Sequence, residues 1–270
     1  MEMCSAQFHM KTRMHKMSLK GKNIIVTGGA GGIGVPLCKK LLADGANVTV
    51  IARSDSLPFE ATLLQGDLSS LEGIEKISEQ LKSIQVDILI NLAGVLYFGL
   101  CEEQSAQDTT TQYMVNLIAP AILTQAVLPQ MKNRGDGHIV NIGSTFGTIG
   151  FPGYVAYCAA KHAIRGFSEA LGRELGDTNI AVIHVSPRAT STDMNSATIE
   201  KLNSELGVTM DSPTLVAKSI VSALKHKKKR SQLGWVETFQ SRINSLIPGI
   251  VDSALARQLP TIKKYIAHSF

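Results

Sequence analysis

The chain has 270 residues, enough for one α/β domain or two small domains. Its content of 44% hydrophobic and 18% charged residues argues against a largely disordered or fibrous protein. The formal net charge of +5 raises the question of a nucleic-acid or anionic-membrane partner.

Targeting, metal and disulfide signals are weak. No run approaches the roughly 18 consecutive apolar residues of a spanning helix, and the first twenty residues lack the apolar core of a secretory signal. The four cysteines stand far apart without metal-ligand spacing, which predicts neither a disulfide framework nor a metal site: Cys4, Cys38, Cys101 and Cys158. We therefore expect a cytoplasmic protein.

Along the chain, residues 1–20 are expected to form a flexible tail, and residues 21–230 an α/β domain. Apolar runs without polar alternation predict strands buried on both faces, separated by helical patterns: Ile24–Val26, Ala46–Ala52, Ala61–Gln65, Val86–Asn91, Gly137–Ile142 and Asn179–Val185. Strands that alternate with helices imply right-handed crossovers and a parallel sheet. The predicted fold is a doubly wound α/β domain of the Rossmann type.

Long helices are predicted over Ala106–Lys132, Val155–Gly176 and Ser212–His226, with a last strand in Arg230–Trp235. Residues 231–270 form an amphipathic C-terminal extension with an approximate helical stripe interrupted by Pro248 and Gly249: Ile243, Leu246, Ile247, Ile250, Val251, Leu255 and Leu259. Such a stripe could pack on the body or a partner subunit, lie on an anionic membrane, or cover a lipid-like substrate.

A glycine cluster, Thr27–Gly34, joins the first strand to the helix that follows it. At this junction, backbone amides and the positive end of a helix can meet a pyrophosphate, and glycine lets the phosphate approach. A P-loop would need Lys and then Ser or Thr after its last glycine, where this chain has Val35 and Pro36. The cluster therefore predicts a dinucleotide site.

The second strand ends Ile51-Ala52-Arg53-Ser54, without the acid that grips the ribose hydroxyls of NAD. Arg53 is placed to receive the 2′-phosphate of NADP, although it could also be a solvated loop cation. NADP(H) is the favoured cofactor, and NAD(H) is possible.

Tyr157 and Lys161 stand four residues apart, so on a helix they share one face. A cation beside a phenol favours the phenolate and brings its pKa toward neutrality. Ser144 ends the strand HIVNIGS, at the edge where open α/β sheets bind ligands, and could hold a carbonyl oxygen that Tyr157 protonates.

Over about residues 20–195, these features resemble the short-chain dehydrogenase/reductase family. The family's motifs occur in order along the chain, and the resemblance implies these cofactor-binding residues: Thr27, Gly28, Gly32, Ile33 and Gly34 in the turn, Asp67 and Leu68 beside the adenine, and Asn91, Ala93 and Gly94 after the fourth strand. Tyr157 and Lys161 are also expected beside the cofactor. Asn116, Ser144, Tyr157 and Lys161 match the family's active-site tetrad.

The resemblance implies a role for each member of the tetrad. Tyr157 is the general acid in carbonyl reduction and the base in alcohol oxidation, and Ser144 positions the substrate oxygen. Lys161 binds the nicotinamide ribose and lowers the pKa of Tyr157. Asn116 marks a helix irregularity that holds a water between Lys161 and solvent.

The chain departs from the family after the sixth strand. The usual Pro-Gly is Pro187-Arg188, while the Thr expected at the nicotinamide amide is present as Thr192. Arg188 could face outward from a loop, or reach into the cleft and favour an anionic substrate. The family's Asp-Gly-Gly turn near the carboxyl end is missing as well.

The leading hypothesis is an NADPH-dependent reductase that interconverts a ketone or aldehyde and the corresponding alcohol, and works as a homo-oligomer. The alternative is a catalytically silent dinucleotide-binding sensor or scaffold. Residues 1–22 carry a net +4 and residues 225–230 a net +5, so the rest carries −4. The basicity belongs to a tail and one helix end, which argues against nucleic-acid binding and leaves peripheral membrane contact open.

Overall fold

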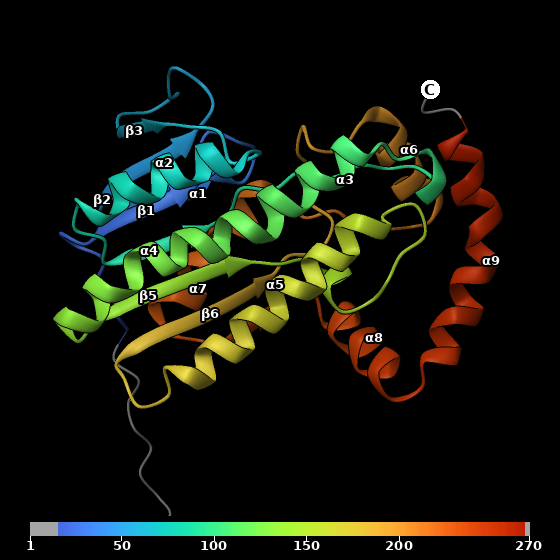
Figure 1. Ribbon diagram of the computed structural model, residues 1–270. Coiled ribbons are helices and arrows are strands. Elements are labelled where there is room, and N and C mark those ends of the chain that lie inside the picture. Colours follow the sequence, from blue (N-terminus) through green and yellow to red (C-terminus); the bar gives the residue numbers. More distant parts are fainter. Residues whose placement is uncertain (1–15, 268–270) are drawn as a thin grey trace, which may run out of the picture.

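The computed structural model describes residues 16–267, and within them the strands form one parallel sheet in the order β3-β2-β1-β4-β5-β6-β7 (Figure 1). The strands are β1 Asn23–Thr27, β2 Asn47–Ala52, β3 Thr62–Gln65, β4 Ile88–Asn91, β5 Gly137–Ile142, β6 Ile180–Ser186 and β7 Arg230–Gln232. The order reverses beside β1, as in a doubly wound sheet. The predicted fold class is confirmed, and the first six strands lie within two residues of their predicted bounds, but β3, at the edge of the sheet, is exposed or half-buried where burial on both faces is expected.

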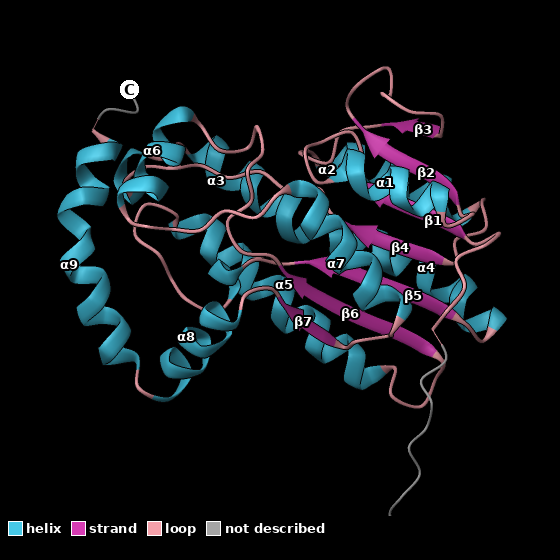
Figure 2. Ribbon diagram, turned by 180° about the vertical axis from the view of Figure 1, so that it is seen from behind, coloured by secondary structure: helices cyan, strands magenta, loops and turns pink. Residues whose placement is uncertain are grey.

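Helices cover both faces of the sheet. They are α1 Gly34–Ala43, α2 Leu71–Lys82, α3 Ala106–Tyr113, α4 Ala119–Arg134, α5 Val155–Glu174, α6 Ala197–Glu205, α7 Pro213–Lys225, α8 Trp235–Leu246 and α9 Pro248–Ile266. One apolar core lies between the sheet and α1 with α7; the other lies between the sheet and α2, α4 and α5 (Figure 2). Strands buried on both faces therefore need the uninterrupted apolar runs seen in the sequence.

Local sequence signals begin several of these helices. Ser70 and Ser212 each accept a hydrogen bond from a backbone N–H in the first turn, of α2 and α7 respectively. Pro213 follows as the first residue of α7, where its missing N–H costs no helical hydrogen bond. These caps fix where α2 and α7 begin.

The helix predicted over Ala106–Lys132 runs to Arg134 and contains a π-helical turn at Met114–Ile118. By length and composition alone, the helix Ala106–Arg134 could cross a membrane. Leu123, Val127 and Met131 are nevertheless fully buried in the core that α4 shares with α2 and the sheet. Packing inside the domain therefore accounts for its apolar residues.

The structure describes the chain just before residue 21 and just after residue 230, the expected bounds of the central domain. Residues 1–15 of the expected tail lie outside the described residues, while Met17 already donates its N–H to the Lys225 carbonyl and Leu19 is buried. At the other end, the last strand stops at Gln232, and Trp235 begins α8 instead of ending β7.

The C-terminal extension forms two helices, α8 and α9, which lie beyond the carboxyl ends of β5 and β6 (Figure 1). Ile262 and Ile266 of α9 are buried against Phe98 and Tyr154, in a third apolar cluster that also includes Leu202 of α6. This docking holds the end of α9 on the body.

Thr27, the last residue of β1, connects two neighbouring strands. Its hydroxyl accepts hydrogen bonds from the backbone N–H groups of Leu92 and Ala93, each at 3.0 Å, just after β4. The side chain is 2% exposed. A buried N–H that loses its acceptor costs free energy because water does not replace the bond.

We expect Thr27→Val to lower the free energy of unfolding by about 2–4 kcal/mol, because two N–H groups lose one acceptor at nearly unchanged side-chain volume. Urea denaturation of both proteins measures the difference. Thr27→Ser keeps the hydroxyl and is the control, expected to lose less than half as much. Equal stability of the Val variant and the wild type would contradict this role of Thr27.

Candidate active site

A pocket of about 1310 Å³ lies at the carboxyl ends of the strands. It runs from Arg53 and Asp67, beyond β2 and β3, past Ser144 and Tyr157 to the side chains of α8 and α9. Pockets for one small ligand usually measure roughly 300–1,000 Å³. This pocket therefore has room for two molecules side by side.

The glycine turn forms one wall of this pocket. Gly28 has φ +70°, and a Cβ there would lie 2.8 Å from the Ala93 Cα. A Cβ on Gly34 would lie 2.2 Å from the Gly28 carbonyl oxygen. Glycine is thus required for the turn to close under the first residues of α1, whose N-terminal amides can bind an anionic group.

Arg53 and Asp67 lie together at the far end of the pocket. Hydrogen bonds from the Ser69 hydroxyl and backbone N–H, with the nearby Arg53 cation, lower the pKa of the Asp67 carboxyl. Asp67 is therefore ionised at neutral pH, and the exposed guanidinium of Arg53 remains available to a phosphate at the same rim.

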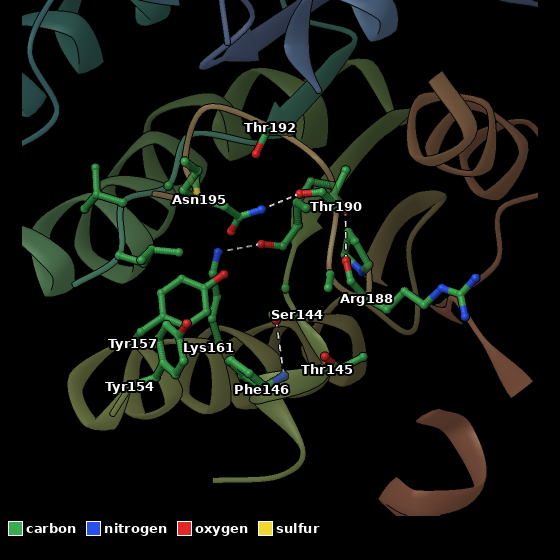
Figure 3. A pocket seen from close by; sticks show the side chains of 18 of the residues that line it. Ser144, Thr145, Phe146, Tyr154, Tyr157, Lys161, Arg188, Thr190, Thr192 and Asn195 are labelled. Carbon is green, nitrogen blue, oxygen red and sulfur yellow. Dashed lines mark hydrogen bonds between the residues drawn. The ribbon is translucent and has the colours of Figure 1, made fainter. Parts of the chain in front are cut away.

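Ser144, Tyr157 and Lys161 meet at the middle of the pocket (Figure 3). Ser144 follows β5 and accepts a hydrogen bond from the Phe146 N–H at 3.2 Å, while Tyr157 and Lys161 share one face of α5. The Lys161 ammonium donates to the Ile142 carbonyl at 3.0 Å and lies 5.6 Å from the centre of the Tyr157 ring. This arrangement brings a hydroxyl, a phenol and a cation to one point.

Burial dominates the proton affinities of these groups. It raises the pKa of Tyr157 to about 12, against the opposing effect of a hydrogen bond with Ser144. Burial also lowers the pKa of Lys161, to about 8. Lys161 is expected to lower the pKa of Tyr157, but it is not among the groups that shift this pKa. The phenol is therefore protonated at neutral pH and can act as a proton donor.

The structure brings most of the predicted site residues into the pocket wall. Those that line it are Gly28, Gly32, Ile33, Gly34, Arg53, Asp67, Leu68, Ala93, Gly94, Ser144, Tyr157, Lys161, Pro187 and Thr192. Thr192 lies over Gly32, because a Cβ on that glycine would meet the threonine side chain at 2.7 Å. Residues from six separate loops thus converge at one edge of the sheet.

Thr27 and Asn91 are not among the residues that line the pocket, and their role as cofactor contacts stays a prediction. Asn91 is buried, and its amide donates to the Asn141 side chain at 2.8 Å; Asn141 in turn donates to Ser168 of α5 at 2.9 Å. Asn91 and Asn141 thus join β4, β5 and α5 underneath the site, as Thr27 joins β1 to the loop after β4.

Asn116 also lies behind the pocket wall, within the π-helical turn of Met114–Ile118. The irregularity expected at this residue is therefore present. Its side-chain amide donates to the Val95 carbonyl at 2.7 Å and accepts from the Val95 N–H at 3.3 Å. These two bonds hold the loop that follows β4 beside Lys161.

Arg188 lines the pocket but points away from Tyr157 and Ser144, toward α8 (Figure 3). Its guanidinium contacts the Asp211 carboxylate at 2.7 Å and the Glu237 carboxylate at 3.5 Å. Arg188 therefore lies at the cleft rather than facing outward from a loop, but two carboxylates already pair with its guanidinium, and whether it favours an anionic substrate stays open. It joins α8 to the loop before α7.

Sequence reasoning missed an aromatic wall beside the tyrosine. Phe146 stacks on Phe151 at 5.0 Å between ring centres and also contacts Tyr154 and Tyr157. The three missed residues, Phe146, Phe151 and Tyr154, all line the pocket. Their concentration between Ser144 and Tyr157 is a signal that the sequence offered.

The predicted stripe of the C-terminal extension divides between two environments. Ile243, Val251 and Leu255 line the pocket, whereas Leu246 and Ile247 are 81% and 56% exposed. Trp235 and Phe239 are exposed on the same side of α8 as Leu246. This outer face is the surface through which a membrane or subunit contact of α8 would be made.

The basic run 225–230 lies elsewhere on the molecule. Lys225 pairs at 2.7 Å with Asp44, at the end of α1, and Arg230 pairs at 3.3 Å with Glu169 of α5. Carboxylates of the body therefore partly neutralise both ends of the run. Among residues 16–267, no group of three or more His, Cys, Asp and Glu side chains could hold a metal ion.

Known proteins resemble this chain in sequence. The chain is 35% identical to a short chain dehydrogenase of Pseudocercospora fijiensis, over 66% of this chain and 62% of that one. The chain therefore spans less than two thirds of the length of this relative. It is 33% identical to a 3-ketodihydrosphingosine reductase of Dictyostelium discoideum, over 77% of this chain and 73% of that one.

Among solved structures, a short chain dehydrogenase from Burkholderia cenocepacia in complex with NADP shares the fold, with a TM-score of 0.75 at 20% identity. The match covers 88% of this chain and 99% of that one. The family model described as short chain dehydrogenase matches residues 22–203, more than half of the sequence. The chain therefore belongs to the short-chain dehydrogenase family.

Proposed function

We propose that this protein is an NADPH-dependent reductase that interconverts a ketone or aldehyde and its alcohol. The observation that carries the proposal is the meeting of Ser144, Tyr157 and Lys161 in the same pocket as the glycine turn. A carbonyl held by Ser144 would lie beside the hydroxyl of Tyr157, which supplies the phenol among these three residues. Bound there, the nicotinamide would supply the hydride.

The residues of the chain would then control the proton. The Tyr157 hydroxyl donates its proton to the carbonyl oxygen in reduction, and Ser144 donates a hydrogen bond to the same oxygen. The Lys161 ammonium, held by Ile142, would lie beside the phenolate that remains, 5.6 Å from the centre of its ring. In alcohol oxidation, the same phenolate accepts the proton.

For the cofactor, we propose NADPH in preference to NADH. Arg53 is exposed at the rim beside Asp67, where the adenosine ribose of a dinucleotide on the glycine turn would lie. The charge of a guanidinium favours a 2′-phosphate over two hydroxyls. NADH remains a possible cofactor at lower affinity.

The alternative is a sensor or scaffold that binds the dinucleotide without turnover. Such a protein would need the glycine turn but not a buried ammonium beside a phenol and a serine, and burying that ammonium costs free energy. Lys161, at 4% exposure, therefore favours the enzyme. The cytoplasmic location, homo-oligomer, lipid-like substrate and peripheral membrane contact expected from the sequence stay predictions.

Replacing Tyr157 with Phe should lower kcat for ketone reduction by at least about a thousandfold, because the proton donor is lost. The dissociation constant for NADPH, measured by its fluorescence, should change less than about threefold. A variant that keeps turnover would eliminate Tyr157 as the acid. NADPH binding without turnover in the wild type, over a broad carbonyl panel, would favour the sensor.

Replacing Arg53 with Ala should lower kcat/KM for NADPH by about 10- to 100-fold, the effect of losing a hydrogen-bonded charge pair, and leave kcat/KM for NADH nearly unchanged. Initial rates with either cofactor measure this. Arg242→Ala, an exposed arginine of α8 outside the pocket, is the control. Equal losses with both cofactors would mean that Arg53 does not read the 2′-phosphate.

The pH dependence should follow the two pKa values. With a Tyr157 pKa of about 12, the phenolate fraction rises about tenfold per pH unit, so kcat/KM for alcohol oxidation should rise from pH 6 to 8. Ketone reduction, which needs the phenol and the Lys161 cation, should stay flat there and fall above the Lys161 pKa of about 8. If kcat/KM for reduction instead falls tenfold per pH unit from pH 6, while kcat/KM for oxidation stays flat, the pKa of Tyr157 lies below pH 6.

A further inference from the structure

The substrate end of the pocket has an apolar wall formed by the C-terminal helices. α8 turns Val236, Gln240 and Ile243 to the pocket, at spacings of four and three residues. α9 adds Val251 and Leu255. The polar side chains that face the pocket from these two helices, apart from Glu237, are the neutral amides of Gln240 and Gln258.

The opposite wall is also apolar. Phe146 and Phe151 line it beside Tyr157, and Leu202 of α6 and Leu206, just after α6, continue it toward α9 with Asn203 between them. An extended hydrocarbon that leaves the carbonyl at Tyr157 would meet carbon on both sides. Burial of each methylene group there would be favourable.

The charges at this end exclude one class of substrate. Arg188 is bound by Asp211 and Glu237, so the triad Arg188, Asp211 and Glu237 carries one excess negative charge. Arg188 directly follows Pro187, whose carbonyl accepts the N–H of Thr145, next to Ser144. A carboxylate or phosphate on the part of a substrate that lies against α8 would lose its hydration and meet this negative charge.

We infer that the substrate is a neutral carbonyl compound with a long hydrocarbon chain, which lies between α6 and the α8–α9 pair, and that the Arg188 triad discriminates against anionic analogues. This inference rests on the proposed function and names its substrate class. Glu237 acts as a specificity determinant, because it occupies the cation that would otherwise bind an anionic substrate.

Chain length is the first test. Reduction of 2-butanone, 2-hexanone, 2-octanone and 2-decanone with NADPH should show kcat/KM rising with each methylene, by up to about fourfold for full burial. The matched pair methyl 4-oxodecanoate and 4-oxodecanoate differs by one charge. The ester should be favoured by at least about tenfold. A flat chain-length series, or a preference for the acid, would overturn the inference.

Two variants of α8 make a matched comparison. Ile243→Asn places an amide on the pocket wall, and Leu246→Asn places the same amide on the outer face of the same helix, where the leucine is 81% exposed. Ile243→Asn should lower kcat/KM for 2-decanone by about tenfold and leave 2-butanone within about twofold. Leu246→Asn should change neither. Equal effects of the two variants would contradict an apolar wall at α8.

Glu237→Gln tests the charge by a gain of activity. It removes one negative charge from the triad and frees one side of Arg188, so kcat/KM for 4-oxodecanoate should rise by about tenfold relative to its methyl ester. An unchanged ratio in a folded variant would mean that the triad does not select against anions.

A measurement without turnover separates this inference from the proposed function. 1-Decanol should raise the Tm of the wild type in the absence of added cofactor, and decanoate should not, because a ligand stabilises the state that binds it. Ile243→Asn should reduce the shift, and Leu246→Asn should not. Stabilisation by decanol with no reduction of any ketone would support the apolar site and reject the reductase. Ketone reduction without stabilisation by decanol and without chain-length dependence would support the reductase and reject the apolar site.

Discussion

One buried ammonium group determines the geometry of the candidate site. Lys161 is 4% exposed, and its charge is held by the carbonyl of Ile142, the last residue of β5. A buried cation that lost this acceptor would be costly, so the bond fixes α5 against the end of the strand. Tyr157, one helical turn earlier, and Ser144, just after the strand, are positioned by the same contact.

Behind this contact, buried polar side chains set the spacing of the elements. Thr27 joins β1 to the loop after β4, Asn91 and Asn141 join β4 to β5, and Asn116 holds the loop at Val95. None of these side chains lines the pocket. They hold the glycine turn, α5 and the loop after β4 in fixed relation, as the proposed reaction would require of its reacting groups.

The pocket is completed by segments outside the regular sheet. The third apolar cluster anchors α9 through Ile262 and Ile266, and Arg188 ties α8 to Asp211. The extension thereby turns one face to the pocket and another outward, where Trp235 and Leu246 are more than 80% exposed. The dinucleotide end depends on the sheet, whereas the substrate end depends on how these last two helices dock.

The sequence by itself determined the fold class and the strands, and it singled out Ser144, Tyr157 and Lys161, which the structure brings into one pocket. Uninterrupted apolar runs require burial on both sides, the glycine cluster has few other uses at a strand-to-helix junction, and four-residue spacing places Tyr157 and Lys161 on one helix face. Each of these is a local property of the chain, so it can be recognised without knowledge of distant contacts.

Only the tertiary structure decided what depends on segments far apart in the chain. It showed that Thr27 and Asn91 support the site from below, that Arg188 is occupied by Asp211 and Glu237, and that burial sets the pKa of Tyr157. It also divided the apolar stripe of residues 243–259 between pocket and surface. Burial and charge pairing are set by which residues meet in space, and a local pattern does not contain that information.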